Sequence, residues 1–368
     1  MQVTVNRRWV RWIPAAAVPA VVAMGLLASG ATAVSPPPPA TPAQVLALAA
    51  GHTARQFSGT LEETADLGLP SIPGQALGAA KGSSTLGSEA ALLELLTVPH
   101  TAKVYADGPA RIRVQVMDQL AERDAIRNGS DAWTYDSSAN TVTHVTLPAG
   151  SAETAPGTPA MTPEQLAQRF LAAADASTDV SLGAPTAVAG HSSYTLVLTP
   201  KASGTLIARV KIAVEAQTGL PLAVDVFAKG QQAPAFHAAY TQLDLKAPDA
   251  SVFAFSPPPG AKITEQRLPA SPGAASQAQK DHPQKDPSQK PAAGTPQGWD
   301  AVVVIPKDKV PAGFTDQPLV KQLSTPAAGG RVISSSLFTV FLANDGRVLA
   351  GAVPASTLEA KASGTTAK

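Results

Sequence analysis

Short one-sided strands separated by turn residues, at 121–147, constrain the fold of this chain most. The segment reads AERDAIRNGSDAWTYDSSANTVTHVTL, and its Asn128-Gly129 pair readily adopts the positive φ angles that a tight hairpin turn requires. Trp133 and Tyr135 alternate with smaller residues and so share one face of the next strand. A second turn at 137–140 leads into a third strand. The pattern predicts an antiparallel meander, and no catalytic motif interrupts it.

The N-terminus has the three parts of an export signal. Three arginines lie among the first eleven residues, an apolar run covers 13–28, and a small-x-small cleavage site follows at 31–33. We therefore expect a signal peptide at 1–33, or alternatively an uncleaved N-terminal membrane anchor, and a Pro-rich spacer at 34–40. Both alternatives predict export across the cytoplasmic membrane, to the cell envelope or the medium.

Composition and motifs exclude several classes of function. The chain has no cysteine, hence no disulfide, thiolate metal site or lipid-modified cysteine, and a net charge of +1 gives no basic surface for nucleic acid. It has no nucleophile elbow, HExxH helix, P-loop or dinucleotide fingerprint. Asp118, Glu122 and Asp124 are interleaved with arginines, so charge pairs on a solvated sheet face are favoured over a paired-carboxylate site. We expect no enzymatic activity, no cofactor and no metal.

The same N-terminal capping pattern predicts two helices. Thr41 can cap a helix that has Pro42 in its first turn and runs to about Arg55, and the Thr162-Pro163-Glu164-Gln165 segment starts another that runs to about Ala174. The rest alternates between apolar and polar residues, as in 57–65, 110–117, 194–199, 206–215, 222–226 and 236–240, with a short last strand at 253–255. One-sided strands at close spacing predict a mainly β fold with some α: a curved antiparallel half-barrel with helices covering its concave face.

Residues 66–100 depart from this meander. Their first part has loop composition, and Ser88 can cap a short helix that ends near Pro99. Leu92, Leu93, Leu95 and Leu96 make this helix a candidate lid over a cavity, the alternative being a helix packed permanently in the core.

Past residue 265 the composition changes twice. Residues 266–298 are rich in Pro, Gln, Ala and Lys without apolar periodicity, which predicts a disordered linker. Residues 299–368 recover strand patterns: a buried-strand run at 301–305 and a hairpin around the Asn344-Asp345-Gly346 turn. They predict a small C-terminal β segment with a flexible end.

Three phrases in the stretch 41–265 resemble the LolA-like lipoprotein-carrier family. The first is the hairpin that contains Trp-x-Tyr-Asp at 133–136. The second, at 194–227, is a strand that ends in Thr-Pro-Lys, followed by a long strand, a Gly turn and another strand. The third is the closing motif Phe-x-Phe-x-x-Pro-x-Gly at 253–260. The resemblance implies a half-open barrel whose concave face binds the acyl chains of lipids or lipoproteins. High alanine content and the Pro-rich export region predict an actinobacterial-type member, for which transport to an outer membrane has no destination.

The first functional hypothesis is therefore an extracytoplasmic binding or carrier protein for a lipid or an acylated lipoprotein. The predicted ligand-binding residues share the apolar face of the strands: Ile112, Val114, Val116, Leu196, Leu198, Val210, Ile212, Val214, Val224 and Val226. For each of them a closed core is an equally good interpretation. The second hypothesis is a regulatory protein that senses envelope lipid and binds a membrane anti-sigma factor, because relatives with that role join a LolA-like domain to a small C-terminal β module through a linker.

Overall fold

The computed structural model describes residues 35–69, 99–117, 121–148, 162–172, 176–267, 298–311 and 313–364. The expected export signal, the four lid leucines and nearly all of the expected linker lie outside these ranges. Among the residues described, no helix is long and apolar enough to cross a membrane. The described residues from Pro36 onward belong to one compact unit.

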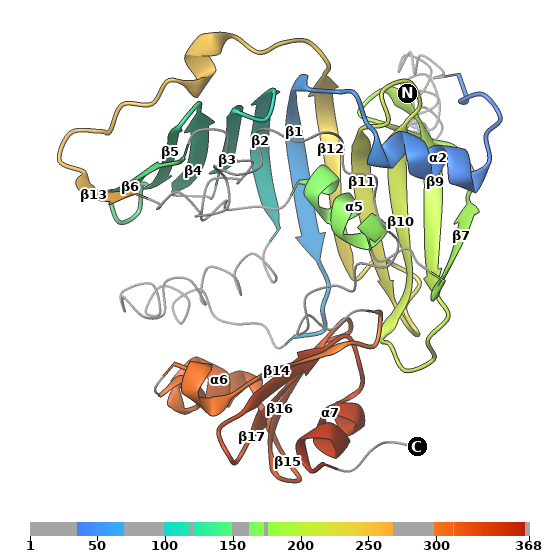
Figure 1. Cartoon of the computed structure of the whole chain (residues 1–368), viewed down its shortest axis with the longest axis vertical. Coiled ribbons are helices and arrows are strands. Elements are labelled where there is room, and N and C mark those ends of the chain that lie inside the picture. Colours follow the sequence, from blue (N-terminus) through green and yellow to red (C-terminus); the bar gives the residue numbers. More distant parts are fainter. Residues whose placement is uncertain are drawn as a thin grey trace, which may run out of the picture. The chain divides into compact units, whose positions relative to one another are not determined.

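Within the described residues the main sheet has thirteen strands and is curved without closing into a barrel, which confirms the predicted half-barrel (Figure 1). Its order is β13-β6-β5-β4-β3-β2-β1-β12-β11-β10-β9-β7, and β8 pairs with β9. Every pairing is antiparallel except that of β13 with β6. The strands are β1 (Gln56–Ala65), β2 (His100–Asp107), β3 (Arg111–Met117), β4 (Glu122–Asn128), β5 (Asp131–Asp136), β6 (Thr141–Thr146), β7 (Thr178–Leu182), β8 (Thr186–Val188), β9 (His191–Pro200), β10 (Ile207–Glu215), β11 (Pro221–Ala228), β12 (Phe236–Asp244) and β13 (Lys262–Arg267).

The hairpin between β4 and β5 forms one residue later than Asn128-Gly129 would place it. Asn128 is still in the ladder, opposite Asp131, so the two turn residues are Gly129 and Ser130. Only Gly129 has a positive φ, 68°. A glycine with positive φ in the first central position is the pattern of a type II′ turn, which suits the twist of the strands and leaves Asn128 extended.

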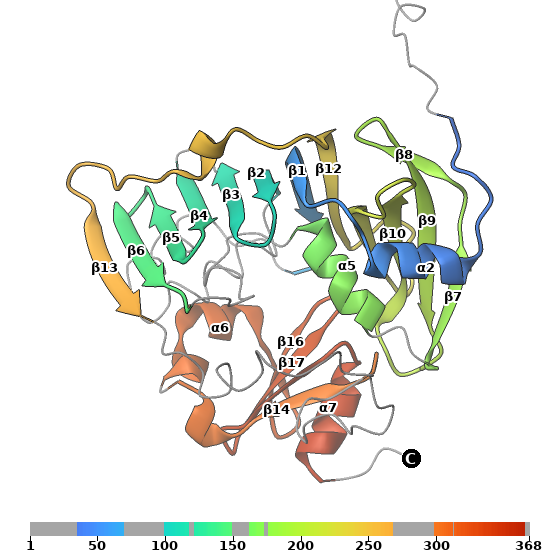
Figure 2. The ribbon, with the colours of Figure 1, turned by 45° about the horizontal axis from the view of Figure 1, so that its top comes forward.

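Two helices, α2 (Pro42–Ala50) and α5 (Pro163–Ala172), lie across the same face of the sheet (Figures 1 and 2). Both begin as predicted, with reciprocal hydrogen bonds between the capping threonine and the glutamine three residues later. The expected end of α2 near Arg55 is wrong, because Gly51 ends the helix after Ala50.

The turn between β10 and β11 packs against the side of α2 that faces the sheet. At Gly219 a Cβ would lie 2.3 Å from the carbonyl oxygen of Leu48, and φ is +79°. The buried carboxylate of Glu215 accepts hydrogen bonds from the backbone N–H groups of Gln217 and Thr218, which holds the turn in place. Only glycine fits this close approach, so the turn positions α2 directly on the sheet.

The segment after β12 crosses the outer face of β3–β5. Its expected short strand at 253–255 is wrong: residues Ala250–Phe253 form a 3₁₀ turn, capped by the Asp249 carboxylate. Phe253 is buried, and Phe255 packs against Trp133 and Tyr135, whose shared face is thereby covered. The chain then adds β13 as an edge strand, which the sequence patterns did not reveal.

The C-terminal part contains a five-stranded sheet in the order β14-β18-β17-β16-β15. Its elements are β14 (Val302–Ile305), two 3₁₀ turns (Lys307–Lys309 and Phe314–Asp316), α6 (Pro318–Leu323), β15 (Thr325–Ala327), β16 (Gly330–Ser334), β17 (Thr339–Ala343), β18 (Val348–Gly351) and α7 (Ala355–Ala362). Phe341, Leu349 and Leu358 form the centre of its core. The expectation of a buried strand at 301–305 is wrong: β14 is an edge strand, and only Val302 of its four residues is buried.

Contacts join this second sheet to the half-barrel. The Ala352 carbonyl accepts a hydrogen bond of 2.7 Å from the backbone N–H of Leu206, and the Ser336 N–H donates to the Leu67 carbonyl at 2.8 Å. Trp299, just before β14, is 6% exposed and belongs to the core of the half-barrel. The C-terminal segment is thus anchored in the main core through Trp299, and Leu337 and Phe338 also pack against residues of the half-barrel.

Candidate functional site

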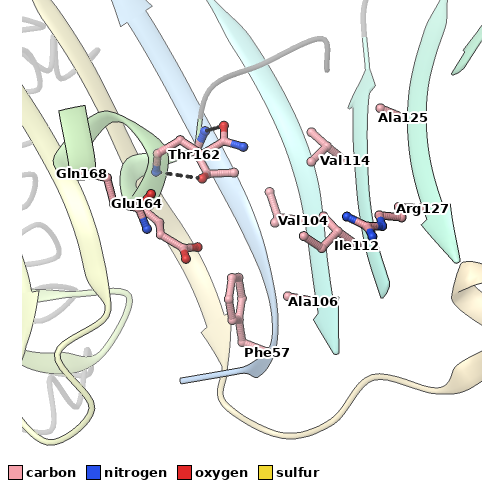
Figure 3. A pocket seen from close by; sticks show the side chains of 11 residues that line it. Phe57, Val104, Ala106, Ile112, Val114, Ala125, Arg127, Thr162, Glu164 and Gln168 are labelled. Atoms are coloured by element: carbon pink, nitrogen blue, oxygen red, sulfur yellow. Dashed lines mark hydrogen bonds between the residues drawn. The ribbon is translucent and has the colours of Figure 1, made fainter. Parts of the chain in front are cut away.

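A cavity of about 160 Å³ lies between the first turns of α5 and strands β1–β4 (Figure 3). It is lined by Phe57, Val104, Ala106, Ile112, Val114, Ala125, Arg127, Thr162, Glu164, Gln165 and Gln168. The sheet supplies the apolar side chains and Arg127, and the helix supplies the other polar ones. The lining is therefore amphipathic.

The cavity exists because small side chains alternate on the strands beneath the helix. Ala106 on β2 and Ala125 on β4 face the space where larger residues would close it, while Val104 and Val114 form its floor. Since β-strand side chains point to opposite faces in turn, these residues all lie on the concave face. The cavity is therefore left open because two of these positions carry the short side chain of alanine.

The polar side of the cavity is held by the start of α5. The Gln165 side chain accepts from the Thr162 backbone N–H at 3.2 Å, and the Thr162 hydroxyl accepts from the Gln165 N–H at 3.3 Å. This reciprocal cap, drawn as dashed lines in Figure 3, fixes the helix end against the cavity. Glu164 and Gln168 lie one turn apart on the same helix and therefore both reach the cavity.

A polar side-chain contact joins the two covering helices. Nε2 of His52, which follows α2, lies 3.1 Å from Oε1 of Glu164 in the first turn of α5. His52 is 7% exposed and the Glu164 side chain 25% exposed, so the contact is partly shielded from water. Together with Leu166 and Ala167, which pack on the sheet, it keeps α5 over the cavity.

The cavity is small for a whole lipid. Small-molecule sites commonly have volumes of about 300–1,000 Å³. An empty apolar cavity of about 150 Å³ accommodates a molecule of the size of benzene. A space of 160 Å³ therefore holds part of an acyl chain, and displacement of α5 would be needed to hold more.

The structure brings the ten predicted ligand-binding residues into one cluster. Nine are buried with exposures of 4% or less, and Ile112 packs against them partly buried. Only Ile112 and Val114 line the cavity. The other eight are buried in the same core cluster: Val116, Leu196, Leu198, Val210, Ile212, Val214, Val224 and Val226. Ligand contact by any of the ten stays a prediction.

Several cavity residues were not predicted from the sequence. Val104 and Ala106 belong to β2, a strand concealed by the atypical composition of the segment before it. The usable signal was the alternation of Ala102, Val104 and Ala106 with polar neighbours. No sequence pattern distinguished Arg127 as a cavity residue, because it is one of several arginines in a segment expected to form a solvated sheet face.

A second buried polar pair lies on the concave face. Glu63 of β1 and His100 of β2 are cross-strand partners, with exposures of 3% and 4%. Burial raises the pKa of Glu63 from 4.5 to about 7, and the nearby His100 lowers it by a smaller amount. Glu63 Oε2 has no hydrogen-bond partner among the described residues. Neither residue lines the cavity, and within the described ranges no group of three or more His, Cys, Asp or Glu side chains is arranged to hold a metal ion.

No protein-family model and no curated protein sequence matches this chain. Solved structures do align with it. The MucA/MucB complex of Pseudomonas aeruginosa is 16% identical, with 87% of this chain and 96% of that one covered and a TM-score of 0.41. A LolA superfamily protein from Nitrosomonas europaea is 12% identical, with 59% and 99% covered and a TM-score of 0.24. An uncharacterized conserved protein from Thermus thermophilus is 10% identical, with 61% and 98% covered and a TM-score of 0.34. LolA superfamily proteins and MucB are thus among the solved structures with which this chain aligns.

Proposed function

We propose that this protein binds an acyl chain of a lipid or lipoprotein outside the cytoplasmic membrane, in the cavity between α5 and strands β1–β4. The observation that carries the proposal is the cavity itself, which has an apolar floor on a curved sheet and a helix as its cover. The role is binding or carriage without chemistry, since the described residues of the lining include no nucleophile with an adjacent base.

The energetics favour a long chain over a short one. Each methylene moved from water into the cavity contributes about 0.8 kcal/mol, so six contribute about 5 kcal/mol. Exposing the buried Leu166 of α5 costs about 1.5–3 kcal/mol. An acyl chain of six or more carbons therefore offsets this cost, whereas a chain of two or three carbons contributes about 1.6–2.4 kcal/mol and does no more than match it.

Filling the cavity tests the proposal. Ala125→Leu places a branched side chain in the space that the ligand would occupy, and we expect at least about tenfold weaker binding of a medium-chain fatty acid, the equivalent of two lost methylene contacts. Isothermal titration calorimetry measures the affinity. The matched control is Ala187→Leu on the exposed strand β8, which should bind like the wild type. Equal affinities for the wild type and the Ala125→Leu variant would place the ligand elsewhere.

We propose a second function, binding of the extracytoplasmic part of a membrane anti-sigma factor, on a separate observation. Edge strand β14 exposes Val303, Val304 and Ile305 by 46%, 40% and 36%. An uncharged apolar edge is a template for an added strand from an extended peptide. Val304→Lys should then abolish capture of the purified anti-sigma domain without affecting fatty-acid binding. Retained capture would exclude β14 as the docking strand.

A further inference from the structure

The outer face of the half-barrel carries a groove that runs along strand β1. It has a volume of about 330 Å³ and is open to solvent. This volume reaches the range of about 300–1,000 Å³ that is common for small-molecule sites. Strand β1 lies between β2 and β12 at this point (Figure 1). The three strands line the groove with polar side chains, which include Ser58, Thr60, Lys103, Tyr105, Gln242 and Asp244.

Short side chains of β1 form the floor of the groove. Phe57 and Leu61 are buried in the core on the concave face. Side chains alternate between the two faces of a strand, so Ser58 and Thr60 point outward. The groove therefore lies on the opposite side of the sheet from the cavity beneath α5, and its floor carries only small hydroxyl side chains.

Longer side chains of the neighbouring strands form the two walls. In the strand register, Ser58 lies between Tyr105 of β2 and Asp244 of β12, and the next floor residue lies between Lys103 and Gln242. Cross-strand partners share one face of a sheet, so all of these side chains stand on the outer face. The walls are two strand spacings apart, about 9–10 Å. The groove is thus wide enough for a ring-shaped ligand and too polar for an acyl chain.

The wall that carries Tyr105 is held in place from behind. Its cross-strand partner on β3 is Arg113, whose guanidinium donates to the Asp124 carboxylate at 2.6 Å and to the Val252 carbonyl at 3.0 Å. Asp124 is 3% exposed, so this support is buried under the segment that follows β12. A wall that is already ordered costs little conformational entropy when a ligand binds.

The groove is bounded along β1 as well. At one end Gln56 donates a hydrogen bond of 2.9 Å to the Asp107 side chain, and at the other end Glu62 follows on the same face. These two ends are six positions apart, about 20 Å along a strand, and their side chains occupy part of that length. The groove therefore suits a compact ligand of one or two rings.

The chemistry of the lining indicates the class of this ligand. Three hydroxyl groups and one amide can both donate and accept hydrogen bonds, and one ammonium and one carboxylate balance each other in charge. Tyr105 adds an aromatic ring with a polar tip. Sugars combine the same two characters, because hydroxyl groups surround the edge of the ring and C–H groups cover its faces.

We propose that this groove is a second binding site, which takes an uncharged saccharide of one or two rings. The sugar stacks on Tyr105, and its hydroxyl groups bond to the polar side chains of the floor and of the opposite wall. The site lies on the other face of the sheet from the acyl cavity and is independent of it.

Isothermal titration calorimetry on the full chain with maltose, cellobiose and N,N′-diacetylchitobiose tests this proposal. We expect at least one of them to bind with a Kd of about 1 mM or less. Tyr105→Ala removes the stacking ring and should weaken that binding at least about tenfold. Thr60→Tyr fills the groove from its floor and should abolish binding without removing any buried contact.

Two control variants should bind the sugar like the wild type. Thr64→Tyr makes the same change on the same strand and face but beyond Glu62, outside the groove. Ala125→Leu fills the cavity on the opposite face, so it separates the two sites. Binding of none of the three sugars, or binding that survives both Tyr105→Ala and Thr60→Tyr, would overturn the saccharide site and leave the acyl site untouched. Tighter binding of glucose 6-phosphate than of glucose would contradict an uncharged ligand.

Discussion

Trp299→Ala should lower the free energy of unfolding by about 3–5 kcal/mol, the usual cost of truncating a buried tryptophan. Trp299 is 6% exposed, stacks on Phe170 of α5 with ring centroids 5.9 Å apart, and donates a 2.7 Å hydrogen bond from its indole N–H to the Thr178 hydroxyl. Its removal leaves a cavity and takes away the indole donor of that hydroxyl. Urea denaturation followed by circular dichroism measures the loss.

The conservative variants separate the two contributions. Trp299→Phe retains a stacked ring but loses the indole donor, and Thr178→Val leaves the buried indole N–H without its acceptor, so each should cost less than Trp299→Ala. The size of the loss bears on function, because α5 lines the cavity at its start and contacts Trp299 near its end. A loss of less than about 1 kcal/mol for Trp299→Ala would mean that the C-terminal sheet is not anchored through this side chain.

Glu63→Gln should stabilise the protein in alkaline solution and have little effect in acid. The folded protein holds this carboxyl at a pKa of about 7, raised from 4.5 by burial, so the protonated form is favoured on folding. Stability from this preference is intact below pH 4.5 and is lost as the pH rises through 7. A difference of one unit between the pKa values of the folded and unfolded protein corresponds to about 1.36 kcal/mol of stability. The free-energy difference between the variant and the wild type should therefore grow by about 3 kcal/mol from pH 4.5 to pH 8.

Glu62 provides the matched control for this experiment. It is the adjacent residue of β1, exposed on the other face, and Glu62→Gln should show much less growth between the same pH values, because its charge is exposed and only assists in raising the pKa of His237. The free energy of unfolding is measured by urea denaturation at several pH values. A difference between Glu63→Gln and the wild type that does not change with pH would contradict a buried, easily protonated carboxyl on the concave face.

The parts of this fold that local chemistry determines were predictable from the sequence. The threonine and glutamine of each capping box are three residues apart, so the starts of α2 and α5 could be read directly. The alternation of Val210, Ile212 and Val214 identified the concave face, because one face of each strand is buried. Both features depend only on near neighbours in the chain.

The parts that depend on distant contacts were not predictable. Nothing within residues 262–267 shows that this exposed segment pairs in parallel with β6, since the pairing partner is more than one hundred residues away. Likewise Trp299 lies beside the expected linker, and its place against Phe170 follows only from the tertiary fold. The cavity is of the same kind: the apolar pattern selected the concave face, but only the position of α5 determines which residues form core and which line a space.

Native mass spectrometry of the protein recovered from its own cell envelope, followed by organic extraction of anything bound, tests the central claim most directly. We predict one acyl-bearing molecule per chain, lipid or acylated peptide. An empty protein that also fails to bind added medium-chain fatty acids would contradict this claim. The space beneath α5 would then be no more than a packing defect, and the exposed edge of β14 would be the functional surface to pursue.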